Sequence, residues 1–246
     1  MTAIPPPGEA IDYPSSDGLP MGETDIHRDE MASAIFVLAD RFRGQNDVYV
    51  AGNLLVYYEE GNPKARFSPD VFVIRGVPNR QRRVYKLWEE QQAPGFVLEV
   101  SSRGTWLEDF GNKKALCARL GVAEYFLYDP EADYLHPSLQ GFRLDGGEYR
   151  HIRPGSGGGL RSKALGLILR LDGLRLRFFD AQTGARLPRP EELARAIEAA
   201  DRARVEADRA RVEADRARAE ADRARAEAEA RLAAAEAELE KLRRRS

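Results

Sequence analysis

The stretch that decides the fold is FVLEVSSRGTWLEDFGNKKALCARLGVAEYFLYDP, residues 96–130. Its apolar runs at 96–100 and 124–130 are typical of buried strands. Between them, Thr105 and Glu108 have the spacing of a capping box, which predicts a helix up to Leu120 with Gly121 as its left-handed stop. A strand–helix–strand unit normally makes its two strands parallel, so we expect parallel strands here.

Glu99 lies within the first of these strands, and its neighbours in the run 96–100 are apolar. An unpaired buried carboxylate costs on the order of several kcal/mol, so something must compensate it. Two interpretations are open. The acid pairs with a structural arginine or lysine, as buried acids usually do, or it helps to bind a metal ion beside a lysine.

The flanking sequence continues with helix and strand patterns. Apolar positions at helical spacing predict an amphipathic helix over residues 23–43. Residues 141–152 and 167–180 predict two β-hairpins, because Asp-Gly turns separate their strand-like runs. Further short apolar runs predict strands at 48–52, 53–59 and 70–74. We therefore expect an α/β or α+β fold with one mixed β-sheet flanked by helices.

Three parts follow along the chain. Residues 1–20 are rich in Pro, Gly and Ser and predict an irregular N-terminal arm. Residues 21–188 contain the helix and strand patterns and form the predicted globular domain. Residues 189–246 form the third part, a charged tail.

The tail is a heptad repeat, with ADRARVE at 200–206 and 207–213 and ADRARAE at 214–220 and 221–227. This period predicts a long helix, and charged pairs such as Asp201 and Arg204 stabilise its exposed surface. Alanine forms the seam, and alanine buries little area, so a coiled coil would be weak. We expect a helix that serves self-association or a partner, or that stays alone in solvent.

Composition excludes several classes of protein. The formal net charge is −2, so tight non-specific binding of nucleic acid through bulk charge is not expected. The single cysteine, Cys117, excludes an intrachain disulfide and fits a reducing compartment. The first residues lack the pattern of a signal peptide, and no apolar run is long enough to span a membrane. We expect a cytoplasmic protein without membrane contact.

Two acids are expected to meet at one point of the sheet. Asp70 follows Pro69 and opens the predicted strand 70–74, so pairing of that strand with 96–100 would bring Asp70 to Glu99. Two carboxylates on rigid strands suit a hard cation such as Mg²⁺. On the following helix, Asp109 and Lys113 share a stripe with apolar residues, which directs Lys113 towards the sheet. Asp70 could instead only start its strand, and Lys113 could be a solvated helix residue.

These residues resemble the Uma family of restriction endonucleases, within the PD-(D/E)XK nuclease superfamily. The resemblance covers about residues 20–185 and rests on PD at 69–70, EVSS at 99–102, D-x-x-x-K at 109–113 and GVAEYFLYDP at 121–130. It implies a restriction-endonuclease-like fold and hydrolysis of DNA phosphodiester bonds with Mg²⁺ or Mn²⁺.

The resemblance also implies roles for individual residues. Asp70 and Glu99 would be the metal ligands and Lys113 the catalytic lysine. The superfamily's lysine usually lies two residues after the acid, where this chain has Ser101, so the helix must supply it. Cys117 stands where the family pattern usually has tyrosine.

Several further residues are weaker candidates. Glu23 and His27 share a face of the first helix and resemble the superfamily's helical acid and the family's helical histidine, although His27 could be structural. Ser101 and Asp109 are possible additions to the site. A basic run could contact phosphates or be a solvated loop; it comprises Arg75, Arg80, Arg82, Arg83 and Lys86.

The leading hypothesis is a metal-dependent DNA endonuclease with a helical tail. The alternative is a catalytically inactive module of the same fold that binds DNA or protein, and divalent-metal binding would discriminate the two. A third hypothesis makes the tail the functional part and the domain its folded cap. The chain lacks the G-x-S-x-G elbow of serine hydrolases and the G-x-x-x-x-G-K loop that binds nucleotide phosphates.

Overall fold

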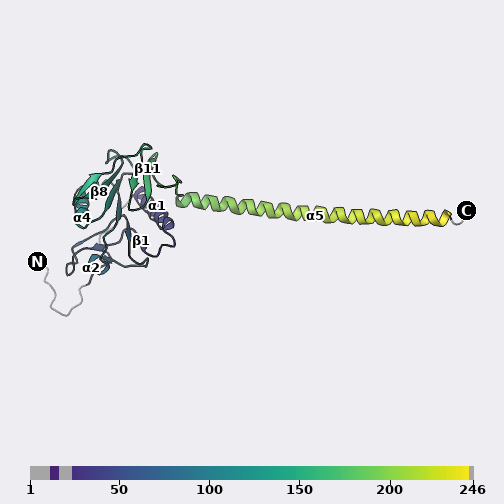
Figure 1. The fold of residues 1–246 in the computed structure, drawn as a ribbon, viewed down its shortest axis with the longest axis horizontal. Helices are drawn as coiled ribbons and strands as arrows, with labels where there is room; N and C mark the ends of the chain where they lie inside the picture. The colour runs from purple at the N-terminus through teal and green to yellow at the C-terminus, as the bar shows by residue number, and fades with distance from the viewer. Residues whose placement is uncertain (1–11, 17–23, 244–246) are drawn as a thin grey trace. The chain divides into compact units, whose positions relative to one another are not determined.

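The computed structural model describes residues 12–16 and 24–243, and it divides the chain into two compact units, Met1–Pro190 and Glu191–Ser246. The first unit contains the sheets and the second consists of helix (Figure 1). Most of the predicted N-terminal arm lies outside the described residues. Tyr13, which is described, packs edge-on against Tyr57 with ring centroids 5.0 Å apart.

The centre of the first unit is a six-stranded mixed sheet in the order β1-β4-β6-β7-β8-β9. β6 and β7 pair in parallel, and the other neighbouring strands are antiparallel. The strands are β1 (Val48–Ala51), β4 (Val71–Arg75), β6 (Phe96–Val100), β7 (Glu124–Tyr128), β8 (Leu139–Asp145) and β9 (Glu148–His151). The predicted parallel pair around residues 96–130 and the hairpin at 141–152 are both confirmed.

The expectation of a single sheet is wrong, because two three-stranded sheets accompany the central one. The first has the order β3-β2-β5, with β2 (Val56–Tyr57), β3 (Arg66–Phe67) and β5 (Tyr85–Lys86), and the short helix α2 (Leu87–Glu90) follows it. The second contains β10 (Leu160–Ser162), β11 (Leu167–Asp172) and β12 (Arg175–Asp180). The hairpin β11–β12 forms as predicted, but its apolar face packs on the core instead of extending the central sheet.

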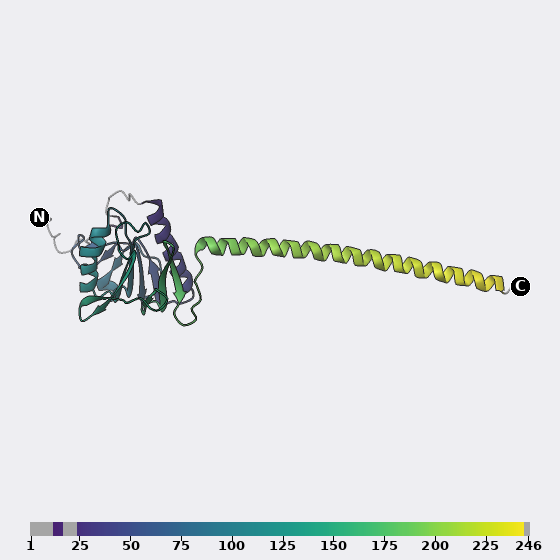
Figure 2. The same cartoon turned by 90° about the horizontal axis from the view of Figure 1, so that it is seen from above.

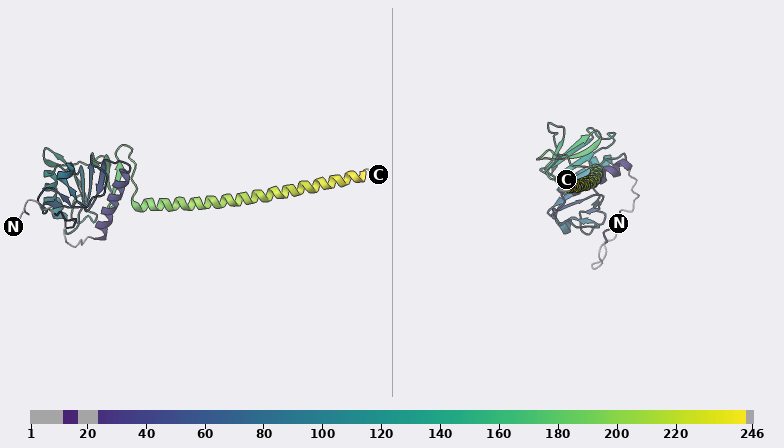
Figure 3. Two further views of the ribbon diagram at one scale, coloured as in Figure 1. Left: turned by 90° about the horizontal axis from the view of Figure 1, so that it is seen from below. Right: turned by 90° about the vertical axis from the view of Figure 1, so that its right-hand side faces the viewer.

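Side-chain alternation divides the core into two layers. Val71 and Val73 face a cluster with Leu38 of α1 (Asp25–Arg41) and Leu167 of β11. Phe72 and the other alternate residues face a second cluster under the helical segment that follows β6. Figures 2 and 3 show α1 and this helical segment on opposite faces of the sheet.

The helical segment after β6 is not one regular helix. It comprises α3 (Trp106–Glu108), a π-helical turn η1 (Asp109–Lys113) and α4 (Lys114–Arg119). The predicted capping box is not formed. Thr105 has helical rather than extended backbone angles, and its hydroxyl accepts a hydrogen bond from the Ser102 N–H instead. Gly121 has φ +80°, as its predicted role as a helix stop requires.

The second unit is the helix α5 (Pro190–Arg243), which confirms the helix predicted from the heptad repeat. Its 54 residues correspond to about 81 Å at 1.5 Å per residue. Exposed ion pairs lie along it, including Arg225 with Glu229 at 3.0 Å and Asp201 with Arg204 at 3.8 Å. The predicted alanine seam is exposed in this single chain.

None of the helices within residues 24–243 combines the length and the apolar composition that a membrane span requires.

Candidate active site

Asp70 and Glu99 lie opposite each other at one end of the central sheet. The antiparallel register pairs Val71 of β4 with Leu98 of β6, so the preceding residue of one strand faces the following residue of the other. The Asp70 N–H donates to Oε2 of Glu99 at 3.2 Å, and the Val100 N–H donates to Oδ2 of Asp70 at 2.8 Å. The two predicted acids therefore meet, held by backbone groups of neighbouring strands.

Lys113 reaches this pair from the helical segment. Its Nζ lies 2.9 Å from Oε2 of Glu99 and 3.2 Å from Oδ1 of Asp109. The π-helical turn η1, which contains both Asp109 and Lys113, directs these side chains towards the sheet. The predicted orientation of Lys113 is confirmed, and its catalytic role stays a prediction.

His27 joins the site from α1. Its Nε2 lies 3.2 Å from Oδ2 of Asp70, and its backbone N–H donates to the hydroxyl of Thr24, the N-cap of the helix. The side chain is only 5% exposed, and Asp70 is 15% exposed. His27 is therefore hydrogen-bonded to Asp70, one of the two predicted metal ligands. Glu23, its predicted partner on the helix, lies outside the described residues.

Asp109, which contacts Lys113, is itself close to Ser101. The Ser101 hydroxyl lies 3.5 Å from Oδ2 of Asp109, at the long limit of a hydrogen bond. The Tyr125 hydroxyl donates to the backbone carbonyl of Asp109 at 2.8 Å, which fixes the π-helical turn against β7. Both Ser101 and Asp109 are buried, and Asp109 contacts the Lys113 ammonium.

The pKa values of the charged groups of the site are shifted in different directions. Burial raises the pKa of Glu99 well above its usual range, against the lowering effect of Lys113. Burial alone would also raise the pKa of Asp70, but the His27 hydrogen bond and the Lys113 charge outweigh it and lower that pKa. Burial disfavours the Lys113 cation, but Glu99, Asp109 and Asp70 together raise its pKa. The three surrounding carboxylates therefore favour the charged form of Lys113.

A cavity of about 310 Å³ gives access to these groups. Its lining is Thr24, His27, Asp70, Ser102, Arg103, Gly104, Thr105, Asp109 and Lys113. The loop 102–105, directly after β6, closes one side. Arg103 was not singled out from the sequence, although its place just after the strand that carries Glu99 is a usable signal.

The acid pair has the chemistry of a divalent-cation site. Oε1 of Glu99 is buried, and no hydrogen-bond partner for it exists among the residues that the structure describes. Such an orphaned oxygen fits a ligand beyond the protein's own groups. Residues 12–16 and 24–243 contain no cluster of three or more His, Cys, Asp or Glu side chains around one point. The protein would thus supply two carboxylates, as Mg²⁺ sites with water and phosphate ligands often do.

The basic run 75–86 is engaged elsewhere. Arg82 is almost fully buried, with 2% of its side chain exposed, and its Nε lies 2.7 Å from Glu90, which also pairs with Arg80 at 3.0 Å. Lys86 pairs with Glu89 at 2.9 Å. Arg75 donates to the carbonyl of Ala164, and Arg83 is exposed. The structure does not bring this run into the lining of the acid-pair cavity.

The fold and the site define an α+β protein in which a mixed sheet presents two paired carboxylates and a buried lysine. The family model of Uma2, described as "Putative restriction endonuclease", matches residues 3–172, more than half of the 246 residues. The chain belongs to this family.

A solved structure is also similar. It is the crystal structure of a protein described as "a putative nuclease belonging to DUF820", from Anabaena variabilis ATCC 29413. The two share 14% sequence identity with a TM-score of 0.43, and the match covers 59% of this chain and 76% of the other. Among curated proteins, no sequence matches this chain.

Proposed function

We propose that this chain is a metal-dependent endonuclease that hydrolyses phosphodiester bonds in DNA. The observation that carries the proposal is the pairing of Asp70 with Glu99 across β4 and β6, with Lys113 Nζ 2.9 Å from Glu99. Membership of a family described as restriction endonucleases supports the same reaction class.

The carboxylates of Asp70 and Glu99 would hold Mg²⁺ or Mn²⁺. When bound, such an ion acts as a Lewis acid on a phosphoryl oxygen and lowers the pKa of a water ligand. The buried and orphaned Oε1 of Glu99 is the feature of this chain that fits a cation.

Lys113, His27 and Asp109 would orient the acid pair and compensate its charge. Lys113 carries a positive charge beside the acid pair, where it can offset the charge that develops on a phosphoryl group during hydrolysis. His27 holds Oδ2 of Asp70 and keeps that carboxylate ionised. Asp109 keeps the Lys113 ammonium in place through the contact at 3.2 Å.

The tail has a separate proposed role. We propose that α5 serves self-association or binds a partner helix, because its exposed surface carries the apolar side chains Val205, Val212, Leu232 and Leu239. Their exposed fractions lie between 44% and 62%, which leaves apolar area that a second helix could cover.

Nicking of supercoiled plasmid DNA tests the nuclease. The purified chain is incubated with Mg²⁺, Mn²⁺ or a chelator, and Asp70→Ala and Glu99→Ala are compared with wild type. Asp145→Ala is the matched control, because Asp145 is an exposed acid of β8, with 70% of its side chain accessible. We expect metal-dependent nicking that both site variants abolish and the control retains.

Two results would count against the proposal. Site variants that nick as well as wild type would move the chemistry away from this acid pair. A folded protein that binds DNA but does not cleave it with any divalent ion would support the alternative, a catalytically inactive module of the same fold.

A further inference from the structure

A second cavity adjoins the candidate active site. Its volume is about 420 Å³, and Lys113 lines both cavities. Arg66 of β3 and Arg119 at the end of α4 contribute two further cations to its wall. This volume lies within the range of about 300–1,000 Å³ that is common for ligand sites.

The two arginines of this cavity are available to an anion. Among the described residues, neither Arg66 nor Arg119 forms an ion pair. Nη1 of Arg66 makes only long contacts, at 3.5 Å with the Tyr57 hydroxyl and at 3.4 Å with the Pro63 carbonyl, which orient the guanidinium without neutralising it. Arg119 is exposed. The acid of the lining is Glu108, and the third cation, Lys113, is already paired with Glu99 and Asp109.

The rest of the lining matches a nucleotide better than a free ion. Ser68 and Asn112 contribute a hydroxyl and an amide, and Leu116 contributes an apolar surface that a sugar or base can cover. Ser68 precedes Asp70 by two residues, so the chain passes from this wall to the acid pair within one short segment. An extended anionic chain bound at the acid pair would pass Lys113 and enter this hollow.

We propose that the cavity lined by Arg66 and Arg119 binds a phosphodiester group of the DNA strand that neighbours the group held at Asp70 and Glu99. Guanidinium groups suit this role, since they bind phosphate oxygens with two parallel hydrogen bonds. The inference rests on the proposed nuclease function. It assigns to Arg66 and Arg119 the binding of substrate and not the chemical step.

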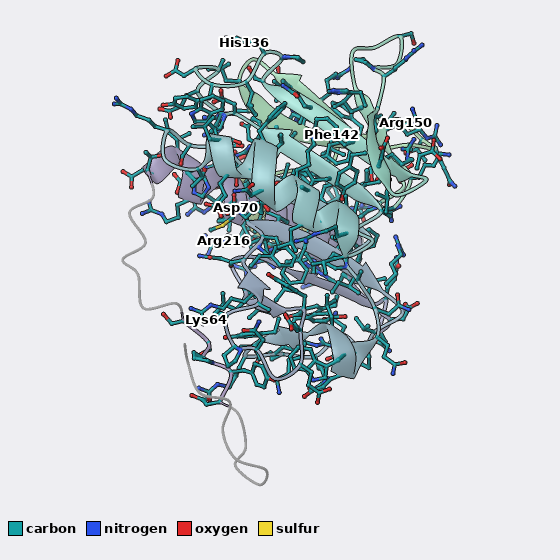
Figure 4. The ribbon with its side chains drawn as sticks, turned by 90° about the vertical axis from the view of Figure 1, so that its left-hand side faces the viewer. Lys64, Asp70, His136, Phe142, Arg150 and Arg216 are labelled. Atoms are coloured by element: carbon teal, nitrogen blue, oxygen red, sulfur yellow. The ribbon has the colours of Figure 1, made fainter. Side chains whose placement is uncertain are left out.

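Two measurements on the full chain test the proposal. The first is fluorescence anisotropy of a short fluorescein-labelled DNA in Ca²⁺ over a series of KCl concentrations. The second is kcat and KM for cleavage in Mg²⁺ or Mn²⁺. The variants are Arg66→Ala, Arg119→Ala and Arg119→Glu. Arg150→Ala is the control, an exposed arginine of β9 that Figure 4 shows well apart from Asp70.

Each alanine variant is expected to weaken DNA binding about tenfold and to lower the salt slope by about one, the signature of one lost phosphate contact. KM should rise with kcat unchanged, because the arginine binds the phosphate equally strongly in the ground state and in the transition state. Arg119→Glu should weaken binding further, and Arg150→Ala should match wild type. Thermal unfolding checks Arg66→Ala, whose side chain is partly buried, and the exposed Arg119 provides the independent variant.

Wild-type affinity and salt slope in both arginine variants would overturn the proposal, as would a wild-type chain that does not bind DNA. Failure of the nuclease itself gives a different result. If the chain binds DNA without cleaving it, the proposed function fails, and the anisotropy of the arginine variants still decides whether the second cavity holds the strand.

Discussion

The ammonium of Lys113 lies 2.9 Å from the carboxylate of Glu99, although Glu99 belongs to a strand and Lys113 to the helical segment that follows it. Asp109 and Lys113 both belong to the π-helical turn, and the Lys113 ammonium contacts Asp109 as well as Glu99. The negative charge of the buried Glu99 is thus compensated by Lys113, a lysine of the same strand–helix–strand unit.

The first prediction concerns this pair. Lys113→Met should reduce kcat for DNA cleavage about 100- to 1,000-fold, as is typical for removal of a group that stabilises transition-state charge. It should also lower the free energy of unfolding by about 3–5 kcal/mol, because it leaves a buried carboxylate without its cation. Steady-state kinetics and urea unfolding measure the two effects.

The double variant Glu99→Gln/Lys113→Met is the control for stability. It removes both charges and should recover a large part of the lost stability without recovering activity. Equal stability of wild type and Lys113→Met would contradict a stabilising role of the contact.

The second prediction concerns His27 and the titration of Asp70. The hydrogen bond from His27 lowers the pKa of Asp70, so His27→Ala should raise it. The acidic limb of the cleavage–pH profile should therefore move to higher pH. Carbon NMR of the Asp70 carboxyl group in the metal-free chain reads the same shift without any activity measurement.

His151→Gln is the matched control, because His151 is exposed on β9 and belongs to the opposite edge of the sheet. An Asp70 titration that is the same in His27→Ala and wild type would show that the 3.2 Å contact does not stabilise the ionised carboxylate.

A third prediction concerns a buried ion pair that ties α1 to the end of the first unit. The Nη1 and Nη2 atoms of Arg189 each lie 2.8 Å from the Glu30 carboxylate, which also accepts a hydrogen bond from the Tyr128 hydroxyl at 3.2 Å. Arg189→Ala should cost about 3–5 kcal/mol in the free energy of unfolding, the usual cost of leaving a buried charge unpaired.

The exposed pair of Arg150 and Asp145 is the control for this experiment. Their side chains are 69% and 70% exposed, so Arg150→Ala should change the free energy of unfolding by less than about 1 kcal/mol. Similar losses in the two variants would contradict the distinction between the buried and the exposed pair.

The fourth prediction concerns acid stability near Arg82 and Glu90. The Arg82 hydrogen bond lowers the pKa of Glu90 below its ordinary value of 4.5. A carboxyl with a lowered pKa in the folded state stabilises the fold above its unfolded pKa, and this contribution is lost as pH falls through the folded pKa. The stability difference between wild type and Glu90→Gln should therefore be largest near neutral pH and fall below pH 4.5.

Urea unfolding at a series of pH values measures this difference, and Glu89→Gln is the control, since the Glu89 side chain is 58% exposed. A difference that grows as the pH falls would have the wrong sign for this contact.

The fifth prediction concerns the tail. Removal of residues 191–246 should leave the thermal unfolding of the first unit unchanged, because both clusters of its core lie before residue 191.

If α5 mediates self-association, sedimentation should give a larger mass for the full chain than for a monomer, and the deletion should yield a monomer. Leu232→Ser with Leu239→Ser should weaken the association without truncation. A full chain that is already monomeric would contradict self-association and leave a separate partner as the role of the helix.

The sequence by itself determined the local elements. Apolar runs, Gly121 and the heptad repeat act within a few residues, so the strands of 96–130, the helix stop and α5 follow from local propensity and period. The sequence predicted that Asp70 meets Glu99 only on the condition that strand 70–74 pairs with strand 96–100, and the observed register meets that condition.

Only the tertiary structure decided the features that depend on residues far apart in the chain. His27 meets Asp70 across 43 positions, and Glu30 meets Arg189 across 159. Arg80, Arg82 and Lys86 of the basic run pair with Glu90 and Glu89, and residues 160–180 form a sheet of their own on the core face of the central one. The physical reason is the same in each case. A charge or an apolar face has no preferred partner until packing brings other residues within contact distance. The local spacing of residues in the sequence does not predict which residues those are.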